Sequence, residues 1–313
     1  MGAIHELILL EGKQDALKAD VRREVVEAAA AYLSDENSGT GFLYTGWCQT
    51  ALPHKKLLDD QDWQVTADNV TLIVEAGARP GPASAPIPIP VGVPYGARAR
   101  LILLYLQSEA LRTGSQNVEL GRSMRSWLTR VGVPVGGKSV AMIRDQAERI
   151  SRCRLTFHFA HGGDVALLNQ NIVDAALFKT DEDGRGRFAQ TARLSDGFFQ
   201  QLKKHPVPLQ ESAIRAISNN SQALDVYAWL AYRLHALTRP TPITWAALKG
   251  QFGLGVGRMD HFRALFLASL QLALAVYPAA RVDVGDTGIT LRPSPPPVPP
   301  KQSARLRQGR LFS

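Results

Sequence analysis

Cysteine is scarce in this sequence, which argues against a disulfide framework and against a cysteine-based metal site. The 313 residues include only two cysteines, Cys48 and Cys153, and neither a CxxC pair nor a cluster of cysteine and histidine occurs. Two cysteines so far apart can pair, but nothing else in the sequence is typical of a secreted, disulfide-linked scaffold. We therefore expect a protein that holds no metal and needs no cofactor.

Long apolar runs are absent as well. No segment reaches the ~18 to 20 apolar residues needed to span a bilayer. The most apolar stretch, residues 262–278, contains Arg263 and Gln271 and is typical of a core helix. The first residues are acidic and amphipathic, whereas a secretory signal has a basic start and an apolar core. These features predict a cytoplasmic protein with no membrane partner.

Acidic residues are outnumbered by basic ones, and the basic excess is unevenly spread. Asp and Glu total 28 against 36 Lys and Arg, giving a formal net charge of +8. Residues 1–37 carry four basic and eight acidic side chains, whereas residues 112–154 carry nine basic and three acidic. A basic block that also has the apolar spacing of a helix is typical of a nucleic-acid-binding face.

The length predicts two domains or one large domain, and the chain begins with a helical segment. Residues 5–33 have helical apolar spacing, with one stripe made of Val21, Val25, Ala29 and Leu33. We therefore assign residues 1–40 to an N-terminal helical extension.

A second segment, residues 41–96, precedes the main helical region. It holds short strand-like pieces at residues 41–47 and 70–76. Residues 77–96 are rich in glycine and proline, which do not sustain a helix, so we expect a loop or extended linker there.

Residues 97–193 show a helix-turn-helix pattern followed by strands. The predicted elements, in order, are a helix at 97–113, a strand at 117–120, helices at 121–132 and 138–153, and strands at 154–160 and 166–178. An HGGD turn joins the last two strands. A helix-turn-helix with an appended β-hairpin is the winged-helix topology.

The same order recurs in residues 221–292, although the two copies do not resemble each other in sequence. The predicted elements are a helix at 221–237, a strand at 241–243, a helix at 244–252 capped by Thr244, a helix at 258–276 and a hairpin around Gly285. Residues 194–220 are expected to form connecting helices. The predicted fold class is therefore α+β, mainly helical, with two tandem winged-helix domains. Residues 293–313 are expected to be a proline-rich spacer and a basic tail.

Several long blocks carry a resemblance to one known family. The blocks are GVPYGARARLILLYLQSEALRTGSQNVELGRSMRSWLTRVGVPVGGKSVAMIRDQAERISRCRLTF, QNIVDAALF, HPVPL, SNNSQALDVYAWLAYRLH and TPITWAALKGQFGLGVGRMDHFR. They strongly resemble the plasmid-encoded RepA replication protein family. The resemblance runs from around Gly41, in GFLYTGWCQTALPHKK, to around Pro293, so the first forty residues and the tail lie outside it.

The resemblance implies a plasmid DNA replication initiator rather than an enzyme. Such a protein binds repeated duplex sites, called iterons, at the replication origin and promotes opening of the duplex. It also recruits host replication factors, such as the helicase or DnaA. Initiators of this broad type commonly form homodimers and repress their own gene as dimers. A transcriptional repressor with the same domains and no direct role at the replisome is the alternative.

In the first predicted domain, the basic side chains of two helices are candidate DNA contacts. Arginine reads guanine in the major groove, whereas Lys and Ser more often hold phosphate. The alternative is a solvated helix face in which Arg149 or Arg152 pairs with Asp145 or Glu148. The candidates on the recognition-like helix are Lys138, Ser139, Arg144, Arg149 and Arg152. Those at the starts of the two preceding helices are Arg98, Arg100, Arg122 and Arg125.

In the second predicted domain, the candidates lie around the start of the third helix. They are Lys249, Arg258, His261 and Arg263. Arg258 and His261 are three residues apart and so lie on one helix face, at the end that usually reaches base edges. An ordinary capping or surface histidine is an equal alternative for His261.

Two patterns raise an enzymatic interpretation, and both are weak. His158 and His161 have the spacing HFAH, and side chains three apart on a strand point to opposite faces, so they cannot chelate one metal ion without distortion. Residues 132–139 formally match the phosphate-binding pattern GxxxxGKS, but a helix rather than a hydrophobic strand is predicted before them. A metal-dependent nickase and an ATPase are therefore the less favoured interpretations.

The extreme C-terminus matches QxxLF through Gln308, Leu311 and Phe312. It resembles the short motif by which bacterial replication proteins bind the sliding clamp. The alternatives are a chance match, a Leu-Phe pair that folds back onto the protein's own surface, or a basic tail that grips DNA.

Overall fold

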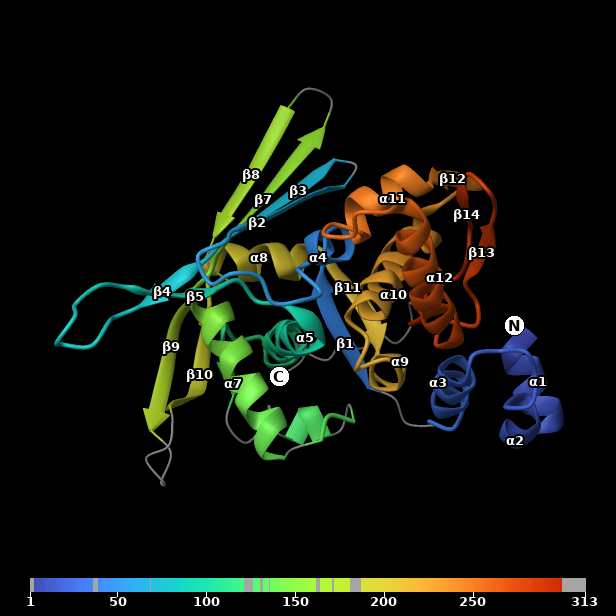
Figure 1. The fold of residues 1–313 in the computed structure, drawn as a ribbon, viewed down its shortest axis with the longest axis horizontal. Coiled ribbons are helices and arrows are strands. Elements are labelled where there is room, and N and C mark those ends of the chain that lie inside the picture. The colour runs from blue at the N-terminus through green and yellow to red at the C-terminus, as the bar shows by residue number, and fades with distance from the viewer. Residues whose placement is uncertain are drawn as a thin grey trace, which may run out of the picture. The chain divides into compact units, whose positions relative to one another are not determined.

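The computed structural model describes residues 3–35, 39–67, 69–120, 126–129, 132–134, 136–161, 164–170, 172–180 and 187–299. The chain is a mixed α/β protein that forms two compact units. One unit, which we call the terminal unit, combines residues 1–43 with residues 207–313. The other, the central unit, comprises residues 44–206. Figure 1 shows the elements of both units, and each unit is considered separately below.

Three helices, rather than one continuous helix, form the N-terminal part of the terminal unit. They are α1 (Ala3–Glu11), α2 (Lys13–Ala16) and α3 (Arg23–Leu33). Gly12 has a φ of 85°, which residues with a Cβ rarely adopt, and it separates α1 from α2. On α3, Val25 and Ala29 are buried, as the predicted stripe requires, whereas Val21 precedes the helix and is exposed.

The C-terminal part of this unit has the element order predicted for residues 221–292. Its elements are α10 (Ser221–Arg233), the short 3-10 helix η1 (Leu234–Ala236), β12 (Thr241–Thr244), α11 (Trp245–Phe252), α12 (Met259–Ala275), β13 (Arg281–Val284) and β14 (Gly288–Arg292). The strands form an antiparallel sheet in the order β12-β14-β13. Thr244 caps α11 by accepting a hydrogen bond from the amide of Ala247, as predicted.

The core of the terminal unit is aromatic. Trp245 and Phe252 of α11 and Phe262 and Phe266 of α12 are all buried, and their rings contact one another. Helix α3 packs against α12 and against α9 (Glu211–Ala216). A two-stranded sheet of β1 (Thr40–Tyr44) and β11 (Pro206–Gln210) completes the unit. The segment 208–220, expected to be helical, therefore begins as a strand.

The described residues of the central unit form several helices and three sheets. The helices are α4 (Thr45–Gln49), α5 (Gly96–Thr113), α7 (Gly137–Arg152) and α8 (Asp196–Lys204); residues 126–129 are also helical. The strands are β2 (Trp63–Ala67), β3 (Val70–Glu75), β4 (Gly77–Arg79), β5 (Ile89–Gly92), β6 (Asn117–Glu119), β7 (Arg154–His161), β8 (Asp164–Gln170), β9 (Val173–Thr180) and β10 (Arg187–Leu194). They form the sheets β2-β3-β7-β8, β6-β10-β9 and β4-β5.

The predicted hairpin at the HGGD turn forms, because β7 pairs with β8 as far as His161 and Asp164, but its second strand is shorter than predicted. The segment 166–178, expected to be one strand, is divided between β8 and β9, which belong to different sheets. Strand β7 pairs with β8 and with β3, so that Phe157 lies opposite Leu72 in the buried layer. Strand β6, which lies between α5 and residues 126–129 in the chain, pairs with a different hairpin. That hairpin consists of β9 and β10, and β10 is the strand that pairs with β6.

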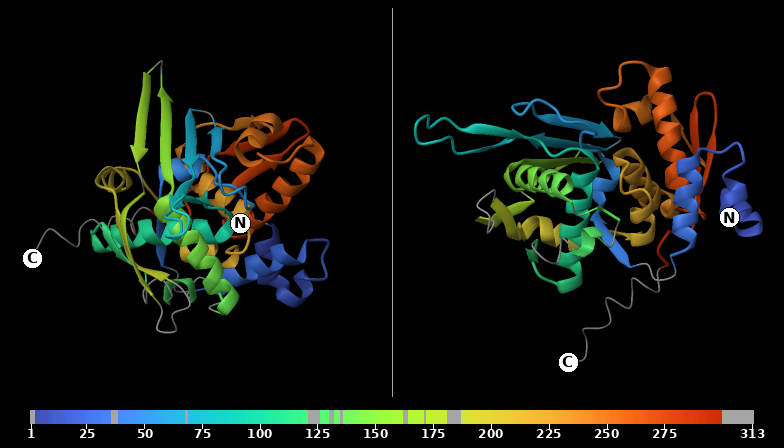
Figure 2. Two further views of the ribbon diagram at one scale, coloured as in Figure 1. Left: turned by 60° about the vertical axis from the view of Figure 1, so that its left-hand side comes forward. Right: turned by 60° about the horizontal axis from the view of Figure 1, so that its bottom comes forward.

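Two segments expected to be loops or spacers are more ordered than predicted. Within residues 77–96, β4 and β5 pair as a hairpin that projects from its unit in Figures 1 and 2. The start of the proline-rich tail is packed onto the terminal unit, since Val298 is buried and the Tyr277 hydroxyl donates to the carbonyl of Pro295 at 2.6 Å. The predicted spacer therefore does not begin at residue 293, because Pro295 and Val298 contact the folded unit.

A candidate nucleic-acid interface

Helix α7 has one anchored face and one exposed face. Ile143, Ala147 and Ile150 are buried at helical spacing and anchor it to the central unit. The opposite face of its first two turns exposes Gly137, Lys138, Ala141 and Met142. The N-terminal half of α7 therefore presents small, apolar and cationic groups to solvent.

Helix α12 in the terminal unit has a similar pattern of exposure, shifted by one residue relative to the start of the helix. Its exposed residues Asp260, His261, Ala264 and Leu265 correspond, at constant separation along the chain, to Gly137, Lys138, Ala141 and Met142. The next residues, Ile143 and Phe266, are both buried. The two helices thus share a pattern of exposure, which the sequence alone did not reveal because their side chains differ.

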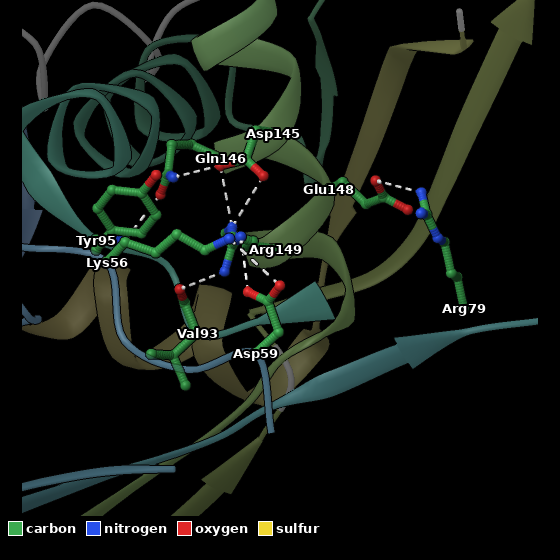
Figure 3. A network of polar contacts seen from close by, with 9 residues as sticks. All are labelled: Lys56, Asp59, Arg79, Val93, Tyr95, Asp145, Gln146, Glu148 and Arg149. Carbon is green, nitrogen blue, oxygen red and sulfur yellow. Dashed lines mark hydrogen bonds and ion pairs between the residues drawn. The ribbon is translucent and has the colours of Figure 1, made fainter. Parts of the chain in front are cut away.

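The C-terminal half of α7 is held by a buried arginine, Arg149 (Figure 3). Its side chain is only 5% exposed. The Nε atom donates to both carboxylate oxygens of Asp145 at 3.0 Å, and Nη2 donates to Oδ1 of Asp59 at 3.1 Å. The guanidinium also donates to the carbonyl of Val93 and lies over the ring of Tyr95, 5.2 Å from its centroid. This network fixes α7 to the segment that contains residues 59–95.

The ion pair influences the ionisation of Asp59. Desolvation alone would raise the pKa of this carboxyl, but hydrogen bonds from Arg149 and Lys56 outweigh it and hold the pKa below its ordinary value. The carboxylate is therefore charged at neutral pH, as the pair with Arg149 requires.

Gly92 permits this close approach. It has a φ of 74°, and a Cβ at this position would collide with Nη1 of Arg149 and Oδ1 of Asp59. Next to it, the amide of Tyr95 donates to Oε1 of Gln146 at 2.8 Å, which ties the same segment to α7 a second time. Position 92 therefore requires glycine because Arg149 and Asp59 pack against it, in addition to its positive φ.

A second contact holds the end of α7. Nε of Arg152 donates to Glu148 at 3.2 Å, and Nη1 donates to the carbonyl of Ala78 at 3.2 Å. Arg79 lies 3.8 Å from the other oxygen of Glu148 (Figure 3). The β4–β5 hairpin is thereby attached to the helix.

These contacts correct the set of DNA-binding candidates on α7. Arg149 is buried against Asp145, and Arg152 pairs with Glu148. Both therefore fit the alternative of pairing within the protein better than a DNA-binding role. Lys138 remains exposed, and Ser139 and Arg144 are half-buried. The partner Asp59 was missed because it lies 90 residues away from Arg149 and no local pattern connects the two.

Arg100 is likewise a brace rather than a surface cation. It is buried, and its guanidinium donates to the carbonyls of Leu52, Pro53 and Gly96. Arg98 is half-buried, and desolvation lowers its pKa. Arg122 and Arg125 lie outside the described residues.

In the terminal unit, the predicted candidates lie around α11 and α12 but are differently engaged. Arg258 forms an ion pair with Asp260, and the guanidinium of Arg263 lies 4.9 Å from the centroid of the Trp245 ring. His261 is exposed, and Lys249 is half-buried. The exposed face of α12 is therefore less cationic than its sequence indicates. Gln308, Leu311 and Phe312 lie outside the part of the chain that the structure describes.

Metal-ligating side chains, cysteines and apolar helices are the other features on which the sequence bears. No group of three or more His, Cys, Asp or Glu side chains within them has the geometry of a metal site. Cys48 and Cys153 are both buried and are not joined by a disulfide; burial raises the pKa of Cys153 to about 12. Among the helices that the structure describes, none is long and apolar enough to cross a membrane.

Comparisons with known proteins bear on both units. Residues 93–246 match the family described as plasmid encoded RepA protein. A crystal structure of SeMet derivatives of domain 2 and domain 3 of RctB has a similar fold, with a TM-score of 0.52 and 10% identity; the match covers 80% of this chain and 98% of that chain. A second crystal structure, of RctB domains 2-3, has a TM-score of 0.42 and 9% identity over 78% of this chain and 93% of that one. The search of the curated proteins found no match to this chain.

Proposed function

Since the chain belongs, through residues 93–246, to the family of plasmid encoded RepA proteins, we propose that it initiates plasmid replication by binding iterons at the origin. It would use two winged-helix domains, in which α7 and α12 are the recognition helices. The protein then promotes opening of the duplex and recruits host replication proteins.

The observation that carries this proposal is the recurrence of one arrangement in the two units. In the terminal unit, α11 and α12 follow β12, and the β13–β14 hairpin pairs with that strand. In the central unit, residues 126–129 and α7 follow β6, and the β9–β10 hairpin pairs with β6. A strand, two helices and a returning hairpin form a winged helix, whose second helix enters the major groove. The β7–β8 hairpin is an insertion in the first copy.

The exposed faces of α7 and α12 support the same conclusion. Each helix is anchored by buried apolar residues and exposes one face of its first two turns to solvent. Bases are read by such turns, while phosphates are held by surrounding cations and by backbone amides. The remaining candidates for these contacts are Arg98, Arg122, Arg125, Lys138, Ser139, Arg144, Lys249, Arg258, His261 and Arg263.

The proposal includes no catalytic step. The GxxxxGKS pattern at residues 132–139 is preceded by helical residues 126–129, whereas a phosphate-binding loop follows a strand. We propose that its glycines instead form the turn before α7. Purified protein with Mg²⁺ or Mn²⁺ is expected neither to nick supercoiled origin DNA nor to hydrolyse ATP, and an ATPase lost in Lys138→Ala would overturn this assignment.

Repression of its own gene by a homodimer is the second role that we propose, following the behaviour of initiators of this type. The two roles differ in their need for host proteins. An initiator supports replication of its plasmid in a cell, whereas a dedicated repressor silences its promoter and leaves replication unchanged when deleted.

The test of the proposed function is competition binding with the full chain. Labelled origin DNA is displaced by unlabelled origin DNA and, separately, by random duplex of equal length. Specific initiators bind their sites ~10³-fold or more tightly than random DNA at physiological salt. Equal competition by the two duplexes would contradict the proposal.

A further inference from the structure

We propose that Met142 and Leu265 read thymine, each packing its side chain on the 5-methyl group of a thymine in the major groove. The inference rests on the proposed function, because it requires α7 and α12 to enter the groove. It adds the chemistry by which the two helices distinguish bases.

The first argument is the repeated exposure of a large apolar side chain. Met142 is 46% exposed and Leu265 is 41% exposed. A single exposed leucine on a soluble protein needs no explanation. Here, however, a large apolar residue comes directly after an exposed alanine and directly before a buried residue in both helices, as the sixth residue of α7 and the seventh of α12. A pattern of exposure that recurs near the start of two comparable helices points to a shared ligand.

The second argument is that three arginines near these faces have partners within the protein. Arg149 is buried against Asp145 and Asp59, so it is not available at the surface of α7. On α12, Arg258 pairs with Asp260 and Arg263 stacks on Trp245. Arginine, which usually contacts guanine with two hydrogen bonds, is therefore not the central side chain of either exposed face.

The third argument is the chemistry of what remains on each face. Lys138 precedes Met142 by four residues, and His261 precedes Leu265 by four, so each apolar side chain has a polar group one turn before it. Thymine offers the O4 acceptor and the 5-methyl group at its major-groove edge. A hydrogen-bond donor beside an apolar side chain matches that edge. Ala141 and Ala264 are small enough to let the helix backbone approach the base pairs.

The test replaces thymine by deoxyuridine, one position at a time, in a duplex origin site bound by the full chain. Deoxyuridine keeps O4 and the base pair and removes only the methyl group. Loss of one buried methyl is expected to weaken binding by about fourfold. We expect the wild type to show this loss at a small number of positions within each site.

The variants assign those positions to residues. Leu265→Ala is expected to abolish the uracil penalty at one set of positions, and Met142→Ala at a different set, while both variants still prefer origin DNA over random DNA. Leu10→Ala, an identical change at an 84% exposed leucine on α1, is the matched control and should keep every penalty.

Three results would overturn the inference. The first is a wild type that binds thymine and uracil duplexes equally at all positions. The second is a penalty that persists unchanged in both alanine variants, which would place the methyl contacts elsewhere. The third is unaltered origin binding by the variants together with loss of a protein partner, which would make these faces protein-binding surfaces. Failure of the wild type to prefer origin DNA at all would instead contradict the proposed function on which the inference rests.

Discussion

Nη2 of Arg149 lies 3.1 Å from Oδ1 of Asp59, and this contact joins the recognition-like helix α7 to a segment 90 residues earlier in the chain. A buried guanidinium that satisfies two carboxylates is costly to disrupt, because removal of either partner leaves a charge without its hydrogen bonds. The contact holds the C-terminal half of α7 and thereby positions the exposed N-terminal half. It also makes the anchoring of the helix testable without DNA.

Replacing Arg149 by alanine is expected to destabilise the protein. Hydrogen bonds to charged groups typically contribute more than neutral ones, so we expect the free energy of unfolding to fall by about 2 kcal/mol. Arg152→Ala, which removes a more exposed pair with Glu148, is expected to cost less than about 1 kcal/mol. Urea unfolding of both variants measures the difference. Equal losses would contradict the role of Arg149 as the principal anchor.

Gly92→Ala is expected to destabilise the protein through the same network. The new Cβ meets the guanidinium of Arg149, and the positive φ adds backbone strain of about 1 kcal/mol or more. In the double variant with Arg149→Ala, the shorter of the two collisions, that with Nη1 of Arg149, is removed, and the combined loss should be smaller than the sum of the separate losses. Gly136→Ala is the control, because nothing lies within 4 Å of a Cβ at that position. If the loss of stability in the double variant equals the sum of the two separate losses, the collision between residue 92 and Arg149 is not its cause.

The pair also predicts a dependence of stability on pH. The folded protein lowers the pKa of Asp59, so the stability that Asp59 contributes is fully present above its ordinary pKa and is lost as pH falls through the lowered value. The free energy of unfolding is measured for the wild type and for Asp59→Asn from neutral pH down to about pH 3. The difference in free energy between the two proteins should become smaller in the acid range. A difference that stays constant over that range would show that Asp59 acts without its charge.

The C-terminal motif predicts binding to the sliding clamp. Leu311 and Phe312 are adjacent apolar residues on an otherwise basic tail, and an apolar groove on a partner would bury them while Gln308 bonds at its rim. Affinity should be modest, roughly micromolar, because a motif of a few residues buries little surface.

A pull-down compares the full chain, a version that ends at Pro300, and the variant with Leu311→Ala and Phe312→Ala. Since the last strand ends at Arg292 and Val298 is the last buried residue among those that the structure describes, truncation after Pro300 spares the terminal unit. Only the full chain should retain the clamp, and both altered proteins should still bind the origin. Equal retention by all three proteins, or by none, would contradict the motif.

Local signals made much of the terminal unit predictable from its sequence. The cap at Thr244 and the hydrophobic spacing of α10 and α12 are properties of short segments, and the strand order β12-β14-β13 follows from the fold that they indicate. The tail was predicted less well, because the seating of Val298 and the bond from Tyr277 to Pro295 depend on tertiary contacts.

The central unit was harder to predict for the same physical reason. The division of residues 166–178 into β8 and β9 is decided by two different pairing partners, β7 and β10, which lie on either side in the chain. Arg149 and Arg100 have the composition of a DNA-binding face, yet their partners Asp59 and Leu52 come from segments with no recognisable link to them. Charge patterns identify basic helices but do not reveal which of their arginines are buried.

Footprinting of the full chain on the origin of its own plasmid tests the central claim most directly. Hydroxyl-radical protection is expected at repeated duplex sites, with two major-groove segments protected in each, one for α7 and one for α12. Binding should weaken by roughly a thousandfold or more between about 50 and 200 mM salt if six or more phosphates are contacted. Protection confined to a single groove, or spread evenly over the origin without repeated sites, would contradict the account.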